Sequence, residues 1–490
     1  MHYKNPVLRG MYPDPSVCRA GDKYYMVCSS MPFFPAVPLF ESDDMVNWQQ
    51  IGHCLTRPSQ VDLAGAEISS GIFAPTIRYN NGRFYMVTTN AVGHDNFYVW
   101  TDDIHGEWSD PLPVDQEGID PSLFFEDGKA YFISNGGDEK GSCIIMSEID
   151  IETGKRLTEP KCLWRGTGGR FMEAPHLYKF GEYYYILDAE GGTEYGHMVN
   201  YGRSKNLWGP FEPYPHNPVL TNRNLGGYIL QGAGHGDVIE DKHGKWWFMH
   251  LAFRQEGMWA TYHHLGRECC LVPVEWSDGW FTMGDGTSRL EYDIPDREAA
   301  QQKLGYRKGF DNLALGKDWC FLRRYDAQRY DFAADRLTIT AAEDDIFGAG
   351  FPTMAMVRQA EFREEISVDL KSSCDEAGIT FFMDGKHHYD LYLDKDGNAV
   401  LRLTIGCISH VQSVVKAGGA AKLTVSAQEY GYTFSVKTAD GVTQLGYADT
   451  KYLSSEVAGG FTGVMLGLYA KDSANRQAVF SGLSIVHNEG

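Results

Sequence analysis

Residues 170–185 read RFMEAPHLYKFGEYYY, and this stretch decides how the chain folds. It opens with a carboxylate, Glu173, one residue ahead of an Ala-Pro pair. It continues as a short apolar strand, turns at Gly181 and returns as an aromatic strand. Two apolar strands on either side of a glycine turn are typical of a β-hairpin. The sequence therefore predicts a hairpin with an acid at its open end.

The same plan recurs four more times along the chain. Each copy has an apolar strand, a glycine-containing turn and an aromatic return strand. The copies open at Asp14, Ala74, Asp120, Glu173 and His235. Spacings of roughly 45 to 60 residues are typical of propeller blades, each a four-stranded sheet. We therefore expect a five-bladed β-propeller, because the alternative, unrelated hairpins in a sandwich, requires no such repeat.

The hairpin pattern ends near residue 293. A charged, glutamine-containing stretch follows and indicates a linker, after which alternating strands predict a β-sandwich. A chain of 490 residues is long enough for two domains with separate cores. The expected all-β architecture is a propeller over residues 1–292, a linker over 293–305, and a concanavalin-like or jelly-roll-like sandwich over 306–490.

Composition and charge narrow the class of partner. The formal net charge of −21 and the pI of about 5.2 argue against nucleic acid or an anionic membrane as the partner. An acidic surface equally serves solubility. The 28 tyrosines suit aromatic strands or a surface that stacks on sugar rings. A small neutral substrate fits this composition best.

The ten cysteines include no CxxC pair and are expected to be reduced and mostly buried. The first ten residues lack the basic-then-apolar pattern of a signal segment. No apolar run is long enough to span a bilayer. A bacterial cytoplasmic location is the expectation.

In a propeller, the innermost strands of all blades begin at the same end of the channel. Asp14, Asp120, Glu173 and His235 are therefore expected to meet in one pocket. Bringing three acids together is unfavourable for their ionisation, which is typical of active sites. Paired carboxylates suit glycoside hydrolysis, in which one protonates the leaving oxygen and another activates water. Glu173 is the expected acid because Phe171 and Met172 surround it with apolar groups.

Six motifs, in order, resemble those of glycoside hydrolase family 43, in particular its β-xylosidase and α-L-arabinofuranosidase branch. They are Tyr12-Pro13-Asp14-Pro15-Ser16, Gly71-Ile72-Phe73-Ala74-Pro75, Gly118-Ile119-Asp120-Pro121-Ser122, Glu173-Ala174-Pro175-His176, Ala189-Glu190-Gly191-Gly192-Thr193 and His264-Leu265-Gly266-Arg267-Glu268. Members of that branch carry a C-terminal sandwich after a five-bladed propeller, so the resemblance covers both expected domains.

The resemblance implies Asp14 as general base, Asp120 as pKa modulator and Glu173 as general acid of an inverting mechanism. It also implies that Arg267 binds sugar hydroxyls and that His235 lies on the channel axis behind the substrate. The chemistry would need no cofactor or metal, although some members hold calcium in the channel, here near His235. From the residues alone, a core histidine and a surface arginine remain alternatives for these two positions.

The sequence departs from the family pattern at the substrate pocket. Met31 stands where relatives commonly have an aromatic residue, and Phe73 stands where they have tryptophan. An alanine, Ala174, replaces the glycine after the acid. We expect Phe33 and Phe34 to supply the missing stacking face.

The expected function is exo-acting, inverting release of β-D-xylose or α-L-arabinofuranose from the non-reducing ends of short oligosaccharides. One alternative is a carbohydrate-binding propeller without catalysis, which has no use for three convergent acids. Another is a retaining fructan or sucrose hydrolase, which would have Asn-Asp-Pro and Glu-Cys where this chain has Pro13-Asp14-Pro15 and Glu173-Ala174. The preferred pentose and the oligomeric state stay open, and a homo-oligomer would be unsurprising.

Overall fold

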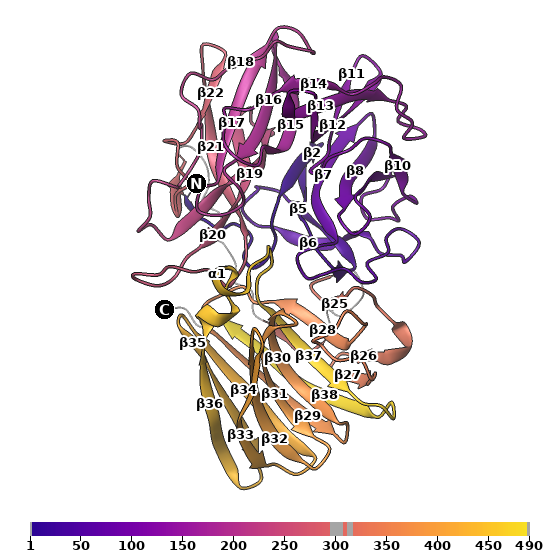
Figure 1. Cartoon of the computed structure of the whole chain (residues 1–490), viewed down its shortest axis with the longest axis vertical. Helices are drawn as coiled ribbons and strands as arrows, with labels where there is room; N and C mark the ends of the chain where they lie inside the picture. Colours follow the sequence, from indigo (N-terminus) through magenta and orange to yellow (C-terminus); the bar gives the residue numbers. More distant parts are fainter. Residues whose placement is uncertain (1, 295–306, 311–316, 488–490) are drawn as a thin grey trace.

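A computed structural model describes residues 2–294, 307–310 and 317–487 of the chain and has two stacked all-β domains. The first domain, indigo to pink in Figure 1, has five four-stranded sheets arranged around a channel. The second, orange to yellow, has two eight-stranded sheets packed face to face. The predicted propeller and sandwich are confirmed. In the described ranges, no helix has the length and the hydropathy that crossing a membrane would require.

Blades two to five are each built from consecutive strands, and blade one skips β4; the first strand of each blade contacts the first strands of neighbouring blades around the channel. The strands of blades one and two are β2 (Ser16–Ala20), β3 (Lys23–Val27), β5 (Ala36–Ser42), β6 (Gln49–Leu55), β7 (Ile72–Asn80), β8 (Arg83–Asn90), β9 (Asp95–Thr101) and β10 (Leu112–Val114). Those of blades three and four are β11 (Ser122–Glu126), β12 (Lys129–Asp138), β13 (Gly141–Ile149), β14 (Lys161–Trp164), β15 (Glu173–Phe180), β16 (Tyr183–Glu190), β17 (Met198–Ser204) and β18 (Glu212–Pro213). Blade five has β19 (Leu230–Glu240), β20 (Trp246–Arg254), β21 (Glu268–Ser277) and β22 (Trp280–Met283).

The hairpin predicted over residues 170–185 is formed by β15 and β16, which pair antiparallel around Gly181. This glycine has a φ of 61°, a backbone conformation that costs residues with a Cβ and suits a tight turn. On the return strand, Tyr185 is buried against Tyr201 and Phe281. The aromatic residues of the repeat thus form the cores of the propeller, as expected for half-buried strands.

One of the two sandwich sheets includes a strand from the propeller's chain segment. The first sheet runs in the order β33 (Ile408–Lys416), β32 (Asn398–Ile405), β31 (His387–Asp394), β30 (Glu376–Asp384), β37 (Met465–Lys471), β28 (Thr353–Arg358), β25 (Cys320–Leu322) and β4 (Phe33–Phe34). The second runs β26 (Tyr330–Ala333), β27 (Arg336–Thr340), β38 (Gln477–His487), β29 (Glu364–Ser372), β34 (Ala420–Gln428), β35 (Gly431–Thr438) and β36 (Gly441–Asp449), and β24 (Arg307–Lys308) pairs with β38. The short helical elements are η1 (Ala327–Arg329), η2 (Thr450–Leu453) and α1 (Ser455–Ala458).

A two-stranded pairing between domains joins the propeller to the sandwich. Strand β4 belongs to the first blade's chain segment, yet it pairs with β25 and so becomes the edge strand of a sandwich sheet. Phe33 of β4 is fully buried in an apolar cluster with Met11 and Leu322. Because this contact buries apolar surface from both domains, the sandwich is held firmly against the propeller.

The predicted linker falls mostly outside the described residues. Strand β23 (Glu291–Asp293) pairs with β1 (His2–Lys4) next to blade five. Of the predicted linker, Asp293 belongs to this pairing and Ile294 follows it, while 295–305 lie outside the described residues.

Candidate active site

Five residues in the left-handed backbone region mark equivalent positions on the five innermost strands. They are Asp14 (φ 57°), Ala74 (φ 35°), Asp120 (φ 54°), Ala174 (φ 53°) and His235 (φ 40°). Non-glycine residues rarely adopt this conformation, and such strain clusters at functional sites. The equivalent of Asp14 and Asp120 in blade four is therefore Ala174, and the acid Glu173 precedes it by one residue, contrary to the alignment expected from the sequence.

Asp14 is a buried carboxylate surrounded by donors. The hydroxyl of Ser29 donates to Oδ2 at 2.6 Å, and Nη1 of Arg267 donates to Oδ1 at 2.8 Å. Nδ1 of His235 lies 3.6 Å from Oδ1. Burial alone would raise the pKa of Asp14, but Arg267, then His235 and Ser29, lower it below its ordinary value. Asp14 is therefore ionised near neutral pH.

Asp120 lies between the other two carboxylates. Its Oδ2 accepts a hydrogen bond from the backbone N–H of Ala174 at 3.1 Å and lies 4.0 Å from Nδ1 of His235. Burial, then the charges of Glu173 and Asp14, raise the pKa of Asp120 well above its ordinary value.

Glu173 begins β15 and is partly exposed to the pocket. It pairs with Ala189 across the hairpin, and the ladder is irregular between Glu173 and His176. Such a bulge re-aims a side chain, here at the mouth of the channel. Burial, then the Asp14 charge, raise the pKa of Glu173 to about 7, although Arg267 opposes the rise. The structure thus places a protonated acid near an ionised carboxylate.

Arg267 is buried and connects the two domains at the site. Its Nη1 donates to Thr193 Oγ1 at 3.0 Å as well as to Asp14, and its Nη2 donates to the backbone oxygen of Phe461 in the sandwich at 3.1 Å. The surface ion-pair alternative does not hold, because the guanidinium is buried among these partners.

A pocket of about 340 Å³, within the range of ligand sites, is lined by Glu173 and Arg267, the latter of which binds Asp14. The propeller lines it with Glu173, Arg267 and Thr193, and also with Phe171, whose side chain is 61% exposed. The sandwich closes it with α1 and the loop that follows, including Phe461. Figure 1 shows α1 at the junction of the two domains. The pocket therefore exists only where the sandwich meets the propeller.

The sandwich segment that lines the pocket, α1 and the loop that follows it, forms hydrogen bonds with the propeller at two places. Oε1 of Glu456 accepts from Tyr195 at 2.8 Å and lies 2.8 Å from Nδ1 of His263. The N–H of Phe461 donates to Ser69 Oγ at 2.8 Å. The sequence offered no signal for this segment, because its role depends on how the domains pack.

The aromatic side chains that were expected to stack on sugar are buried. Phe33 is fully buried at the domain junction, and Phe34 is buried in the core between blades one and two. Met31 is buried too and pairs with Ile72. None of these three side chains lines the described pocket. Stacking of Phe33 and Phe34 on sugar therefore stays a prediction, and their burial does not favour it. Phe73 is partly exposed at the position before Ala74, which corresponds to that of Glu173.

The residues behind His235 do not fit a calcium ion. Asp237 is buried, and its oxygens accept from Ser16 at 2.6 Å, from Tyr178 at 2.6 Å and from Arg78 at 2.6 Å. Calcium requires several free oxygen ligands, whereas here the carboxylate is occupied and the Arg78 guanidinium repels a cation. Burial lowers the pKa of His235, so it faces Asp14 and Asp120 as a neutral imidazole near neutral pH.

Another group of potential metal ligands within the described ranges lies on blade three. One ligand atom from each of Asp138, Cys143 and Cys162 lies within 4.8 Å of the others. Asp138 already forms an ion pair with Arg165, so this carboxylate is not free.

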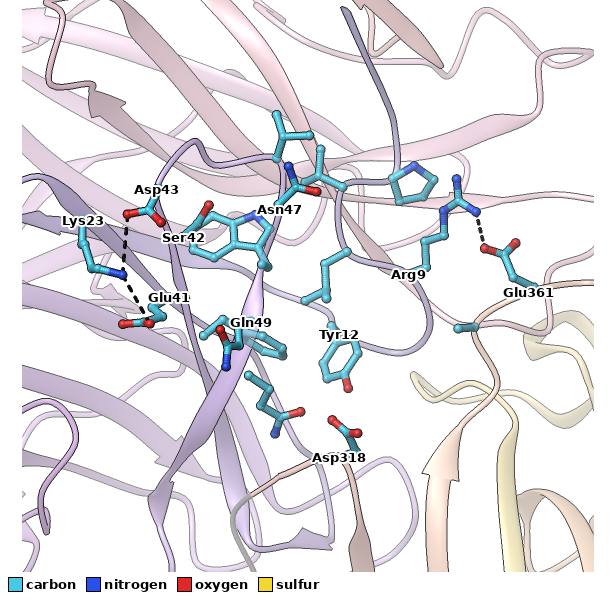
Figure 2. Close-up of a pocket in the computed structure, with 18 of the residues that line it drawn as sticks. Arg9, Tyr12, Lys23, Glu41, Ser42, Asp43, Asn47, Gln49, Asp318 and Glu361 are labelled. Atoms are coloured by element: carbon cyan, nitrogen blue, oxygen red, sulfur yellow. Dashed lines mark hydrogen bonds and ion pairs between the residues drawn. The ribbon is translucent and has the colours of Figure 1, made fainter. Parts of the chain in front are cut away.

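A larger cavity, of about 740 Å³, lies at the seam between blade one and the sandwich (Figure 2). The ion pair of Arg9 and Glu361 stands on one side, and Lys23 lies between Glu41 and Asp43 on the other. The described residues that line it do not include the three channel carboxylates. Size alone therefore does not identify the active site.

An ionised carboxylate and a protonated one beside a small pocket, on a five-bladed propeller, define a glycoside hydrolase site. The sequence model described as glycosyl hydrolases family 43 matches residues 3–281, and that of the beta xylosidase C-terminal concanavalin A-like domain matches residues 307–483. The chain belongs to glycosyl hydrolases family 43 and is a glycosidase.

Relatives align along nearly the whole chain. The non-reducing end alpha-L-arabinofuranosidase of Bacteroides ovatus is 39% identical, with 97% of this chain and 92% of the relative covered. A xylosidase/arabinosidase of Butyrivibrio fibrisolvens is 34% identical, with 96% of each covered. The solved structure of Bacteroides ovatus xyloglucan PUL GH43B superposes with a TM-score of 0.93 at 36% identity and covers 100% of both chains.

Proposed function

We propose that this glycosidase removes single pentoses, β-D-xylose or α-L-arabinofuranose, from the non-reducing ends of xylo- or arabino-oligosaccharides by an inverting mechanism. The observation that carries the proposal is that the pKa values of two interacting carboxyl groups are shifted in opposite directions. The pKa of Asp14 is lowered, whereas that of Glu173 is raised to about 7. Inverting glycosidases need such a base and such an acid at the same pH.

In the proposed reaction, Asp14 removes a proton from a water molecule, whose oxygen attacks the anomeric carbon. The bond from that carbon to the glycosidic oxygen breaks, and Glu173 gives its proton to the departing oxygen. Asp120 holds the backbone beside the acid through the N–H of Ala174. The reaction needs water but no cofactor. Afterwards Asp14 loses its proton, and Glu173 regains one, by exchange with solvent.

The shape of the site supports exo action. The sandwich lines one side of the pocket with Phe461 and the residues around α1, so both domains bound the site. A pocket admits the end of a chain but not its middle. The name of the Bacteroides ovatus relative, a non-reducing end arabinofuranosidase, agrees with this proposal.

Both pentoses are proposed as substrates because the Butyrivibrio relative is named for both. The test is proton NMR of xylobiose and of arabinofuranosyl-decorated xylotriose from the earliest time points. First appearance of α-xylose or β-arabinose would support inversion and identify the pentose. First appearance of the retained anomer would contradict the inverting mechanism, and no product from either substrate would contradict the proposed specificity.

A further inference from the structure

The acid Glu173 is preceded by an exposed loop that has no regular secondary structure. This loop, residues 165–172, leads from β14 to β15 and contains three glycines, Gly166, Gly168 and Gly169. Loops of this composition are intrinsically mobile. A general acid, however, must be held to within a fraction of an ångström of its productive position. Some contact must therefore hold the loop.

That contact is a fully buried carboxylate, Glu190, at the end of β16. Its Oε1 accepts from the backbone N–H of Thr167 at 2.5 Å, and its Oε2 accepts from the Thr167 hydroxyl at 3.1 Å. Oε2 also accepts a short hydrogen bond from the N–H of Gly169. Successive backbone N–H groups around one anion form a strong binding arrangement, because each hydrogen bond is assisted by the charge.

The glycines of the loop make room for this carboxylate. A Cβ on Gly166 would stand 2.4 Å from Oε1 of Glu190, and a Cβ on Gly169 would stand 2.3 Å from Oε2. Both distances are too short for any side chain. The loop is thus wrapped around Glu190 closely enough that only glycine is accommodated at these two positions.

The residue after Glu190 fastens the far end of the same loop. The N–H of Gly191 donates to the backbone oxygen of Arg170 at 2.8 Å, and Nε of Arg170 donates to the oxygen of Gly191 at 3.0 Å. Ala189, on the other side of Glu190, is the cross-strand partner of Glu173 itself. The segment 189–191 therefore contacts both the loop and the acid that follows it.

A neighbouring carboxyl group lies beside Glu190. Asp188 lies on the same face of β16, two residues away, and its Oδ1 accepts from Nε1 of Trp164 at 2.9 Å. Burial, and then Glu190, raise the pKa of Asp188 well above its ordinary value. Asp188 is therefore neutral near neutral pH.

We propose that Glu190 is a positioning residue for the general acid: its buried carboxylate holds the loop 166–170 and thereby sets the place of Glu173. This inference rests on the proposed function. Glu190 does not touch the substrate in this account and acts only through the loop.

The test is Glu190→Gln, which keeps the shape but replaces one acceptor oxygen by an N–H donor. We measure kcat/KM for xylobiose, which needs protonation of its leaving group, and for a dinitrophenyl xyloside, which needs little. The ratio of the two values does not depend on the fraction of folded enzyme. We expect the ratio to fall on the order of tenfold, because a misplaced acid affects the poor leaving group most.

Two further variants serve as controls for this test. Thr167→Val removes only the hydroxyl contact and should lower the ratio by less. Glu182→Gln makes the same chemical change on the same hairpin, at an exposed residue bonded to Lys205, and should leave the ratio unchanged. An unchanged ratio in Glu190→Gln would overturn the inference, whereas a wild type inactive on both xylosides would overturn the proposed function first.

Hydrogen exchange supplies a readout that needs no substrate. The amides of Thr167 and Gly169 should exchange faster in Glu190→Gln than in the wild type, because their acceptor is lost. Exchange at wild-type rates at these two amides would also overturn the inference, whatever the sugar specificity.

Discussion

The guanidinium of Arg267 donates to the carboxylate of Asp14 at 2.8 Å, and both side chains are buried. The arginine reaches this position from the start of the fifth blade's third strand, and the aspartate from the start of the first blade. The pair explains how a buried carboxylate keeps its charge, because the nearby cation offsets the loss of hydration. The charge of Asp14, the proposed base, thus depends on a distant part of the chain.

We predict that Arg267→Met moves the acidic limb of the pH profile of kcat/KM to higher pH. The charge that lowers the pKa of Asp14 is lost, so the base becomes protonated at a higher pH. The maximal kcat/KM should also fall on the order of 10²-fold or more, since a buried charged donor is lost. Ser29→Ala removes a neutral hydrogen bond and should shift the limb less. An acidic limb at the wild-type pH in Arg267→Met would contradict the assignment of Asp14 as base.

Glu173→Ala should separate substrates by their leaving groups. The kcat/KM for xylobiose should fall by about 10²–10⁴-fold. The kcat/KM for aryl xylosides with acidic phenols should fall much less, because such a phenol leaves as the phenolate and needs no proton. Asp14→Ala should lose activity on both kinds of substrate. Steady-state kinetics on the two substrates check this, and equal losses in Glu173→Ala would count against its role as the acid.

The alkaline limb of the activity profile should lie near pH 7. The pKa of Glu173 is raised to about 7, so the acid loses its proton as the pH rises through this value. A profile of kcat/KM for xylobiose between pH 4 and pH 9 tests this prediction. Activity that stays constant well above pH 8 would show that another group is the acid.

The same pKa predicts a change in stability with pH. Between the unfolded pKa of 4.5 and the folded value of about 7, the folded state binds more protons than the unfolded state. Its stability therefore falls as the pH rises through this window. Glu173→Gln removes the effect and should raise the free energy of unfolding at pH 8 by on the order of 1–2 kcal/mol, but by less at pH 5. Urea unfolding at the two pH values measures the difference, and an equal gain at both would contradict it.

Phe33 and Phe73 should respond in opposite ways to the same substitution. Phe33→Leu should lower the free energy of unfolding by about 1 kcal/mol and leave KM unchanged, because the ring is part of the domain junction. Phe73→Leu should raise KM with little effect on stability, because its side chain is partly exposed and occupies the repeat position that Glu173 has in blade four. Thermal unfolding and xylobiose kinetics of both variants test these predictions. A lower stability identifies a core residue, and a higher KM identifies a residue of the substrate pocket.

Much of the fold could be predicted because it depends on local sequence patterns that repeat along the chain. The five hairpins depend on residues close in the sequence, such as the pairing of β15 and β16 around Gly181. Edge strands were harder to predict. The residues of β33 are largely exposed and show no clear alternation between buried and exposed positions, so they give little strand signal. Strand β4 has only two residues, and its partner, β25, is almost 300 residues away.

Part of the site could also be predicted from the repeated pattern. Asp14, Asp120 and Glu173 converge because the inner strands of a propeller begin at one end, which the repeat reveals. The local alignment was off by one residue in blade four, where a left-handed Ala174 takes the repeat position. Aromatic character alone suggested Phe33 and Phe34 as a sugar platform, but burial at a junction cannot be read from neighbouring residues.

The sequence by itself determined the two β domains, the carboxylates at the channel and the family. These follow from periodicity and from motifs in which each residue's surroundings are nearby in the chain. Only the tertiary structure decided the charge states and the pocket walls. The ionised state of Asp14 depends on Arg267, and the closed pocket depends on Phe461, which contacts the propeller across the domain interface. Electrostatics and shape are set by distance in space, which the order of residues does not give.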